Sequence, residues 1–351
     1  MFFLGLGTAV PPHRYRQSEC WEALQNAPQF ARLSARSKAI LKKALQNSSI
    51  ASRHLALDPL AEAFALSPDI LHARFASQAP ILATRAAEAA MAKAAVAKEE
   101  IDALLISTCT GYLCPGLTSY VSERLGLASS TLCLDLVGQG CGAAIPNLRV
   151  AEALLASGRA GKALSICVEV CSAAFYLDDD PGVLISACLF GDGAAAAVVG
   201  QTPGAGTRRV EWLESMSLMD SGGRDCLKFE QRNGMLRNIL TKPVPGIAAK
   251  HAKEILKATL ARRKLSSREI AAWIFHPGGR DVLAALAESL ELSEADLAGS
   301  AAVLREFGNM SSPSVLFVLQ AAFEGGAASG YWWISSFGAG FSCHGALLRV
   351  E

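Results

Sequence analysis

Three side chains in this sequence have types and local contexts that suit nucleophilic chemistry, and the first is a cysteine. Cys141 lies in the segment VGQGCGAA, after a strand-like run at 131–136 and before a helical pattern at 144–157. Glycines on both sides permit a sharp turn, and a helix N-terminus favours a thiolate. The pattern predicts a nucleophile on a strand–turn–helix junction. The alternative interpretation is a small residue at a tight turn.

The other two candidates also follow apolar runs and precede helical patterns. His276 stands in IFHPGG and Asn309 in FGNMSSPS. An imidazole can stabilise a thiolate, and an amide N–H together with an imidazole N–H can hold a developing oxyanion. Considered separately, His276 could be a capped structural histidine and Asn309 could be a turn residue. Taken together, the three residue types suit one mechanism.

The remaining histidines and most cysteines look structural. Four histidines stand among charged or loop residues and are expected in solvent, and one lies in the final apolar run: His13, His54, His72 and His251, then His344. Four cysteines lie in apolar, strand-like runs and are expected as buried thiols: Cys133, Cys167, Cys188 and Cys343. Neither CxxC nor a zinc spacing occurs, so no metal is expected. Ten cysteines are too sparse for a disulfide scaffold, which favours reduced thiols in the cytoplasm.

Composition excludes several classes of protein. The chain has 351 residues, 51% hydrophobic and 19% charged, so a large core is expected and disorder is not. The net charge of +1 gives no basic field for nucleic acid. No apolar run is long enough for a membrane span, and no basic region precedes the apolar start, so a signal peptide is not expected.

Strand-like and helical patterns alternate along the chain, which predicts an α/β protein. Strands are expected at 103–107, 131–136, 163–168, 194–200, 272–275, 331–335 and 345–350, and helices at 83–97, 117–125, 144–157, 245–261, 282–289 and 314–323. Two similar glycine-rich turns, FGDG from Phe190 and FGAG from Phe337, stand near the ends of two halves. They suggest a duplicated unit with a boundary in 201–208. Neither fits a nucleotide-binding motif.

Five motifs together resemble the type III polyketide synthases, the chalcone synthase-like enzymes of the thiolase superfamily. They are GQGCGAAIPNL, LFGDGAAAAVV, IFHPGG, FGNMSSPSVLFVL and SFGAGFS, and they occur in the family's order. The resemblance runs from Gly5 to the end of the chain. The alanine-rich composition and the length are similar to bacterial members.

The resemblance implies a thiolase-like, duplicated αβαβα five-layered fold that forms a homodimer. The half at 1–205 would carry the nucleophile Cys141, and the half at 206–351 would carry His276 and Asn309. Malonyl-CoA would be condensed, with loss of CO₂, onto an acyl-CoA starter held on Cys141. Cyclisation would give an alkylpyrone, an alkylresorcinol or a related small aromatic. No cofactor is implied besides the coenzyme A thioesters themselves.

The resemblance also assigns residues to a substrate cavity. Phe190 matches a gatekeeper phenylalanine, whereas Asn238 stands where a second gatekeeper phenylalanine is usual. Ala174 replaces a larger threonine and Phe229 replaces a glycine. Further cavity positions are Cys109, Thr110, Ser311 and Phe337, with Cys114 reaching into the partner subunit's cavity. Cys109 could equally be a buried structural thiol.

Coenzyme A phosphates need cationic groups at a tunnel mouth. The resemblance implies that Lys43 is one of them, although a solvated lysine on an exposed helix is the alternative. A second cationic position of the family is Asn47 here, which weakens that phosphate site. Gly278 and Gly279 would let the pantetheine arm approach the backbone closely.

Three other functions compete with this interpretation. A ketoacyl synthase III-like enzyme uses the same residue types but is loaded by an acyl carrier protein, and the HPGG and GNMSSPS contexts favour the polyketide family instead. A non-catalytic partner subunit would have lost its nucleophile, and Cys141 is present. A papain-type hydrolase would need a local pattern that does not occur.

Overall fold

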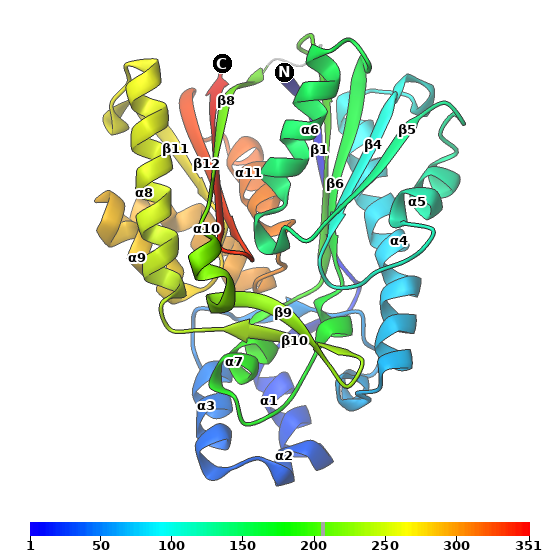
Figure 1. Ribbon diagram of the computed structural model, residues 1–351, viewed down its shortest axis with the longest axis vertical. Helices are drawn as coiled ribbons and strands as arrows, with labels where there is room; N and C mark the ends of the chain where they lie inside the picture. Colours follow the sequence, from blue (N-terminus) through cyan, green and yellow to red (C-terminus); the bar gives the residue numbers. More distant parts are fainter. Residues whose placement is uncertain (205–207) are drawn as a thin grey trace.

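A single mixed sheet of nine strands runs through the middle of the molecule (Figure 1). The computed structural model describes residues 1–204 and 208–351. Within them the strand order is β11-β12-β13-β8-β1-β7-β6-β4-β5. These strands are β1 (Phe2–Ala9), β4 (Ala103–Thr108), β5 (Leu132–Val137), β6 (Lys162–Glu169), β7 (Gly193–Gly200), β8 (Val210–Met219), β11 (Ile270–Phe275), β12 (Gly330–Gly338) and β13 (Ser342–Val350). Two antiparallel pairs lie outside the sheet: β2 (Arg14–Arg16) with β3 (Ser52–His54), and β9 (Leu227–Arg232) with β10 (Met235–Leu240).

Helices cover both faces of this sheet and form a smaller lobe below it. The helices are α1 (Gln17–Gln25), α2 (Pro28–Arg32), α3 (Ala35–Leu45), α4 (Pro68–Ala94), α5 (Leu117–Leu125), α6 (Ala144–Ala156), α7 (Pro181–Leu189), α8 (Val244–Arg263), α9 (Arg280–Leu290), α10 (Glu294–Phe307) and α11 (Ser314–Glu324). The lobe holds α1, α2, α3 and α7, together with the β9–β10 hairpin (Figure 1). None of the described helices is long and apolar enough to cross a membrane.

The strand order repeats between the two halves of the sheet. In the first half β7 lies antiparallel between β6 and β1, and β6 runs parallel to β4. In the second half β13 lies antiparallel between β12 and β8, and β12 runs parallel to β11. The halves meet where β1 pairs with β8. The sequence boundary expected at 205/206 falls among residues outside the described part.

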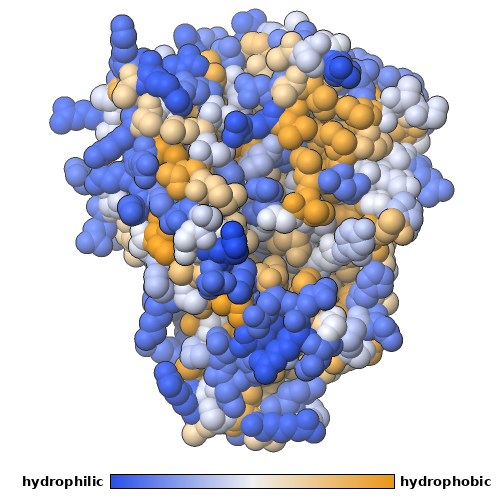
Figure 2. Space-filling model, viewed as in Figure 1, coloured by the Kyte–Doolittle hydropathy of each residue, from blue (hydrophilic) through white to orange (hydrophobic). Residues whose placement is uncertain are grey.

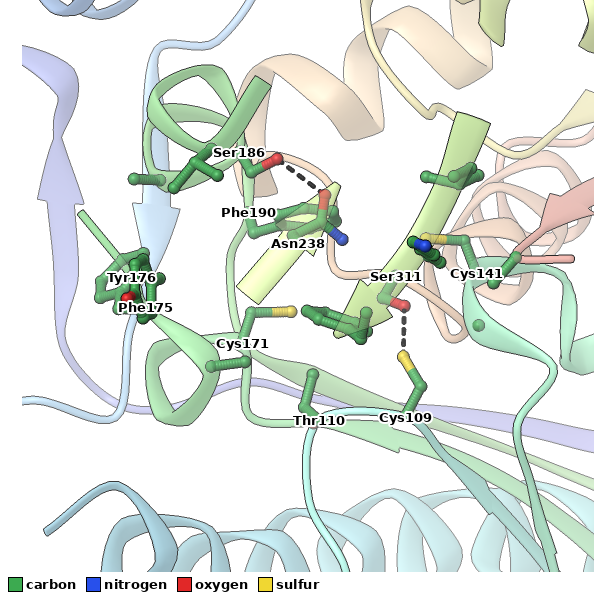
Figure 3. A pocket seen from close by; sticks show the side chains of 18 residues that line it. Cys109, Thr110, Cys141, Cys171, Phe175, Tyr176, Ser186, Phe190, Asn238 and Ser311 are labelled. Atoms are coloured by element: carbon green, nitrogen blue, oxygen red, sulfur yellow. Dashed lines mark hydrogen bonds between the residues drawn. The ribbon is translucent and has the colours of Figure 1, made fainter. Parts of the chain in front are cut away.

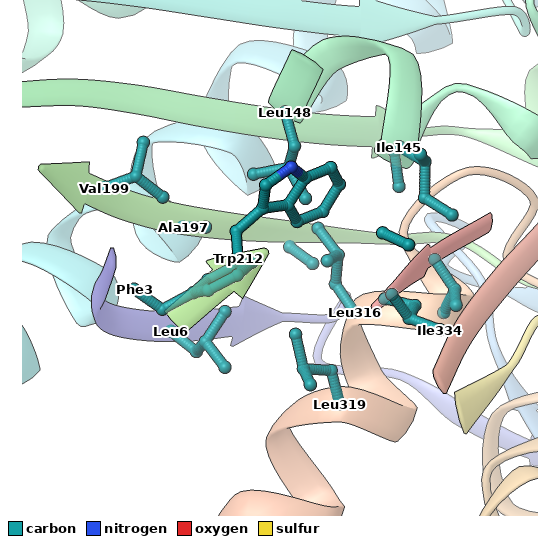
Figure 4. Close-up of a cluster of buried hydrophobic side chains, with 14 of the residues drawn as sticks. Phe3, Leu6, Ile145, Leu148, Ala197, Val199, Trp212, Leu316, Leu319 and Ile334 are labelled. Carbon is teal, nitrogen blue, oxygen red and sulfur yellow. The ribbon is translucent and has the colours of Figure 1, made fainter. Parts of the chain in front are cut away.

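The elements stack in five layers, as the thiolase-like expectation required. One apolar cluster joins α4 and α5 to the first half of the sheet, and another joins α8 and α9 to the second half. Between them, α6 and α11 pack against both halves (Figure 1). Trp212 of β8 lies in this central cluster among Phe3, Leu148 and Val199 (Figure 4). The central layer is therefore held from both sides.

The helix that follows Cys141 is fixed by a buried asparagine. Asn147 of α6 is fully buried, and its Nδ2 donates to Ser107 Oγ (2.8 Å) and to the Ile166 carbonyl (3.0 Å). Its Oδ1 accepts from Ser165 Oγ at 2.9 Å. A buried amide with full hydrogen bonding sets both the rotation and the depth of a helix. The start of α6 is therefore held against β4 and β6.

All seven expected strands and all six expected helices are present, with shifted ends. The largest shift is in the helix expected at 83–97, which is the second half of α4 and ends at Ala94. The sequence analysis missed β1, β8, the β9–β10 hairpin, the three N-terminal helices, α7 and α10. In particular, α7 reads PGVLISACL, an apolar run too short to distinguish a strand from a buried helix.

We predict that Asn147→Ala lowers the free energy of unfolding by about 2–4 kcal/mol, because two serine hydroxyls and a carbonyl lose their partner in the core. Chemical denaturation would measure this loss. Thr259→Val is the matched control, since the buried Thr259 hydroxyl has no partner among the described residues. The control should change stability by less than about 1 kcal/mol. Equal losses in the two variants would contradict the anchoring role of Asn147.

Candidate active site

Cys141 lies on a tight turn between β5 and α6, as the sequence predicts. The turn is a single 3₁₀ turn over Gly140–Gly142 that leads directly into α6. Gly138 and Gly140 both have positive φ, at 86° and 55°. Such angles strain residues other than glycine, which explains the glycine on the N-terminal side of the cysteine.

A second glycine turn fixes this turn from the other half of the molecule. A Cβ on Gly338 would lie 2.2 Å from the carbonyl oxygen of Gln139 and 2.9 Å from the Gly142 nitrogen. The two backbones are therefore in direct contact. Ser336 Oγ also donates to the Gly142 carbonyl at 3.0 Å. The FGAG turn is thus a structural support for the turn that carries Cys141.

His276 follows β11 and is almost fully buried. Its backbone N–H donates to the Ser335 carbonyl, and its carbonyl accepts from the Gly278 N–H. The ring Nδ1 is buried and has no partner in the described residues. Burial lowers the pKa of His276 to about 3, so the imidazole is uncharged at neutral pH.

Asn309 is held by the segment that carries Phe190. The Asn309 N–H donates to the Leu189 carbonyl, and the Gly191 N–H donates to the Asn309 carbonyl, both at 3.0 Å. The side-chain Oδ1 accepts from the Ser311 N–H at 2.7 Å, and Nδ2 donates to the Gly278 carbonyl at 3.2 Å. An amide NH₂ has two protons, so one remains for a further acceptor.

The thiol of Cys141 is protonated at rest. Burial raises its pKa to about 12, although hydrogen bonding with Ser311 and Asn309 acts in the opposite direction. The thiol and the His276 imidazole are therefore both neutral at pH 7. The sequence analysis expected a stabilised thiolate, and burial opposes it because a charge is costly in a dry site. A proton transferred from the thiol to the imidazole would leave the pair without net charge.

Cys141 lines two adjoining hollows. One is an inner cavity, and the other is a tunnel that also has His276 and Asn309 in its wall. Phe190 lines both, and its gatekeeper role stays a prediction. The other predicted cavity residues in the inner wall are Cys109, Thr110, Ala174, Phe229, Asn238 and Ser311 (Figure 3). Gly278, Gly279 and Phe337 line the tunnel instead, so Phe337 does not line the inner cavity.

A buried carboxylate behind the inner cavity was missed by the sequence analysis. Glu169 is fully buried at the end of β6. Its carboxylate accepts from the backbone N–H groups of Cys109 and Thr110, and from Ser312 Oγ at 2.6 Å. Further, longer contacts come from the Cys109 thiol (3.3 Å) and Ser311 Oγ (3.4 Å). The signal in the sequence that could have revealed Glu169 was a single carboxylate at the end of a largely apolar strand.

The β9–β10 hairpin closes the inner cavity and is clamped by one arginine. Arg237 is largely buried and contacts Asp178 at 2.8 Å and Glu230 at 2.9 Å. Phe229 and Asn238 are paired neighbours on the hairpin and face the cavity. The Asn238 side chain accepts from Ser186 Oγ at 2.8 Å (Figure 3). Asn238, the residue predicted at a second gate, is therefore hydrogen-bonded to α7.

Two cations line the tunnel near its mouth, and the sequence analysis named neither. They are Lys242, which follows β10, and Arg280, which begins α9. Arg280 also forms an ion pair with Asp281. Lys43 is exposed on α3 and is not among the tunnel-lining residues, although Ala44 and Asn47 beside it are. The coenzyme A role of Lys43 stays a prediction.

Three expectations about structural side chains were wrong. Cys188 lies on helix α7, and Cys133 is exposed on the edge strand β5. His251 is buried on α8 and contacts Asp220 at 3.2 Å, whereas solvent was expected. Cys114 is exposed on this chain. No cluster of three potential metal ligands occurs in residues 1–204 and 208–351.

We predict that Gly338→Ala destabilises the protein by about 3 kcal/mol, because its Cβ would collide with backbone rather than with a movable side chain. Thermal or chemical unfolding would show the loss. Gly246→Ala is the control, since an added Cβ at this exposed helical position meets nothing within 4 Å. That variant should be neutral or stabilised by up to about 1 kcal/mol. A Gly338→Ala protein as stable as the control would show that the turns are not in contact.

The raised pKa of Cys141 predicts how its reactivity depends on pH. The thiolate is a minor species below the pKa, so alkylation of Cys141 by iodoacetamide should accelerate about tenfold per pH unit between pH 7 and 9. Peptide mass spectrometry would follow this site separately from the other cysteines, with Cys141→Ala as the background. A rate that levels off below pH 8 would instead indicate a preformed thiolate–imidazolium pair.

Comparisons with known proteins agree with this architecture. Two family models match: chalcone and stilbene synthases, N-terminal domain, over residues 1–203, and the C-terminal domain of the same family over residues 225–350. The crystal structure of PKS-I from the brown alga Ectocarpus siliculosus superposes with a TM-score of 0.91 at 28% identity. That alignment covers 99% of this chain and 97% of the algal one.

Similar curated proteins come from bacteria. A 3,5-dihydroxyphenylacetyl-CoA synthase of Amycolatopsis balhimycina is 28% identical, over 99% of this chain and 92% of its own. A 1,3,6,8-tetrahydroxynaphthalene synthase of Streptomyces peucetius subsp. caesius is 30% identical, over 97% and 91%. An alpha-pyrone synthesis polyketide synthase-like protein of Mycobacterium tuberculosis is 29% identical, over 99% and 90%. The chain thus belongs to the chalcone and stilbene synthase family and is a type III polyketide synthase, an acyltransferase that acts on coenzyme A thioesters.

Proposed function

We propose that Cys141 carries the starter acyl group and the growing chain, with His276 and Asn309 as its catalytic partners. The supporting observation is that Cys141 lines both the tunnel, where His276 and Asn309 lie, and the inner cavity behind Phe190. A thioester on this sulfur is accessible to a coenzyme A thioester in the tunnel. Its acyl chain meanwhile extends into a largely apolar cavity that keeps water away from reactive ketone intermediates.

Loading begins when Cys141 Sγ attacks the carbonyl of an acyl-CoA starter. The thiol proton passes to the neutral His276, the bond between the carbonyl carbon and the coenzyme A sulfur breaks, and coenzyme A leaves as the thiol with that proton. Both groups are uncharged before and after the step. The buried site therefore never has to hold an isolated charge.

Extension begins when malonyl-CoA binds in the tunnel and loses CO₂. The electron pair of the broken C–C bond moves into the thioester as an enolate. The free Nδ2 proton of Asn309 and the tunnel-side N–H tautomer of His276 stabilise its oxyanion. The enolate carbon attacks the Cys141 thioester, a C–C bond forms, and the C–S bond to Cys141 breaks with the sulfur leaving as a thiolate. That thiolate attacks the thioester of the lengthened chain, and coenzyme A leaves. Return of the lengthened chain to Cys141 allows another cycle.

Product release is proposed to follow cyclisation to an alkylpyrone, an alkylresorcinol or a related small aromatic. Ala174 leaves room in the inner wall, whereas Phe229 occupies part of it. The names of the similar proteins refer to three different products, so they do not choose among these ring types. Lys242 and Arg280 are placed to contact the coenzyme A phosphates, because both are cationic side chains in the tunnel wall.

The experiment that tests this function is mass spectrometry of products formed from malonyl-CoA and acyl-CoA starters, from acetyl to long-chain. We expect Cys141→Ala to form no condensation product, because no other group holds the starter. His276→Gln and Asn309→Ala should lower CO₂ release from malonyl-CoA by about a hundredfold or more. Gly246→Ala serves as an active control. Products from Cys141→Ala, or unchanged CO₂ release, would reject the assignments.

We further propose that the protein acts as a homodimer formed through the edge strand β5. One edge of β5 has no partner strand in the described chain, and its apolar side chains are open to solvent, with Leu132 40% and Val137 56% exposed. Apolar surface gathers on the face where β5 and α6 lie (Figure 2). Tyr112, in the loop that also carries Cys114, is 69% exposed. Such a patch and a free strand edge are unfavourable in a monomer.

Val137→Asp should shift the protein towards the monomer in sedimentation equilibrium, because the introduced charge would be buried at the interface. The wild-type protein should have twice the chain mass. Ala261→Asp on the exposed face of α8 is the control and should remain dimeric. A monomeric wild-type protein at micromolar concentration would rule out the proposed dimer.

A further inference from the structure

Helix α3 lies in a segment of the chain that contains cations and no carboxylates. Between Glu22 and Asp58 the sequence has no aspartate or glutamate, and its lysines and arginines are Arg32, Arg36, Lys38, Lys42, Lys43 and Arg53. The whole chain has a net charge of only +1, so carboxylates elsewhere balance this segment. The small lobe therefore concentrates positive charge in a way that the overall composition does not show.

Three of these cations lie together on the exposed face of α3. Arg36, Lys42 and Lys43 are exposed, and their spacing of six and seven residues places them on the same side of the helix. We refer to these three residues as the basic face. Of the others, Lys38 donates to a backbone carbonyl, and Arg53 is buried.

The basic face borders the tunnel that leads to Cys141. Lys42 and Lys43 line a shallow surface hollow together with Asn47, and Asn47 also lines the tunnel. The tunnel wall itself contains Lys242 and Arg280, next to the starts of α8 and α9. Helix α3 lies below these two helices in the view of Figure 1. Cations therefore continue from the tunnel wall onto the outer surface of the lobe.

The basic face extends further than a coenzyme A molecule requires. A coenzyme A whose pantetheine arm occupies the tunnel has its phosphates at the mouth, beside Lys242 and Arg280. Arg36 is nine residues before Leu45, where α3 ends, which corresponds to about 14 Å along the helix axis away from the tunnel. A cation at that distance is suited to a partner larger than coenzyme A.

Helix stability does not explain the position of Arg36. Positive charges stabilise the C-terminal end of a helix, which accounts for Lys42 and Lys43 in the last turn. Arg36 is in the first turn of α3, where a positive charge is unfavourable. In the described part of the chain none of these three cations forms an ion pair, whereas Arg280 pairs with Asp281. The charge at Arg36 becomes favourable when an acidic partner binds.

A soluble acidic protein fits this surface better than a membrane does. Peripheral membrane proteins combine cations with apolar side chains that enter the lipid. The apolar side of α3 is instead buried, because Leu41 and Leu45 pack in the core of the small lobe. None of the large apolar side chains exposed in the described residues belongs to α3.

We propose that the basic face is a docking surface for an acidic acyl carrier protein, which delivers the starter to Cys141. The proposal rests on the proposed function, in which Cys141 holds the starter. A carrier protein presents its acyl group on the same pantetheine arm as coenzyme A, so the arm can enter the same tunnel while the protein covers the lobe beside it.

The transfer uses the chemistry proposed for loading. Cys141 Sγ attacks the carbonyl of the carried thioester, and the bond between the carbonyl carbon and the pantetheine sulfur breaks. The arm leaves as a thiol with the proton that passed through His276. Malonyl-CoA remains the extender, so the carrier protein is needed only for the starter.

The first test compares two donors of the same acyl group, for groups from acetyl to hexadecanoyl. One donor is the coenzyme A thioester, and the other is a purified bacterial acyl carrier protein with the group on its phosphopantetheine arm. Intact-protein mass spectrometry measures the rate constant for acylation of Cys141, with Cys141→Ala as the background. We expect the carrier protein to be about tenfold faster at low salt, and to lose this advantage at about 0.5 M salt because exposed charges are then screened.

A charge-reversal variant tests the surface itself. Arg36→Glu/Lys42→Glu changes two exposed residues that do not line the tunnel, so the fold should be retained. Acylation by the carrier protein should fall about tenfold or more, and acylation by coenzyme A thioesters should change less than about twofold. Arg159→Glu/Arg268→Glu is the matched control, since it makes the same charge change at exposed positions beyond the C-terminal ends of α6 and α8. It should acylate at the wild-type rate with both donors.

The outcomes separate this inference from the proposed function. If coenzyme A thioesters acylate Cys141 but the carrier protein does not, or if the charge reversal leaves the carrier rate unchanged, the docking surface is rejected and the proposed function stands. If neither donor acylates Cys141, the proposed function fails and this inference fails with it. A wild-type protein that cosediments with phosphatidylglycerol vesicles and is not acylated by the carrier protein would assign the basic face to a membrane surface instead.

Discussion

Backbone contact between two glycine turns, one from each half of the molecule, is the constraint on which the site depends. Gly338 approaches Gln139 and Gly142 so closely that no side chain fits between them. Cys141 is therefore positioned by main chain on both sides, and by the Asn147 anchor below it. Because no cavity-lining side chain takes part in this arrangement, the walls of the cavity can change in sequence while the sulfur stays in place.

The protonation states of the residues in the site follow from their burial. Cys141 and His276 are neutral at rest because burial opposes both charged forms. Glu169 behind the cavity is surrounded by backbone N–H and hydroxyl donors and forms no ion pair within the described part of the chain. Burial raises the pKa of Glu169, so this group also tends towards neutrality. Fixed dipoles rather than ions surround the reacting atoms, and in a dry site they stabilise a transient oxyanion without first being reorganised.

The sequence alone was sufficient to predict the strands and helices of the central layers and the residues around the Cys141 sulfur. Cys141, His276 and Asn309 were identified because each lies in a turn rich in glycine or serine before a helical pattern, which is a local signal. Cys141 and His276 follow strands as expected, whereas Asn309 follows helix α10. Glu169 was missed because its partners lie 59 or more residues away in the sequence. The tunnel cations Lys242 and Arg280 were missed because solvated lysines and arginines have no distinguishing pattern. The pairing of Phe190 with Asn309 depends on topology, which a local pattern does not contain.

The parts of the protein that were predicted from the sequence hold the proposed catalytic residues. The parts that were not predicted form the walls proposed to select the substrate. The repeated sheet and its central helices hold the sulfur, the imidazole and the amide. Much of the wall of the inner cavity and the tunnel comes from segments outside the repeat, among them α3, α7 and the β9–β10 hairpin. Arg53 links the cavity wall to the proposed gate. Its guanidinium donates to the carbonyl of Ala187 in the wall and to that of Phe190 at the gate. A change in the small lobe can therefore reshape these walls, and the backbone contact that holds Cys141 is unaffected.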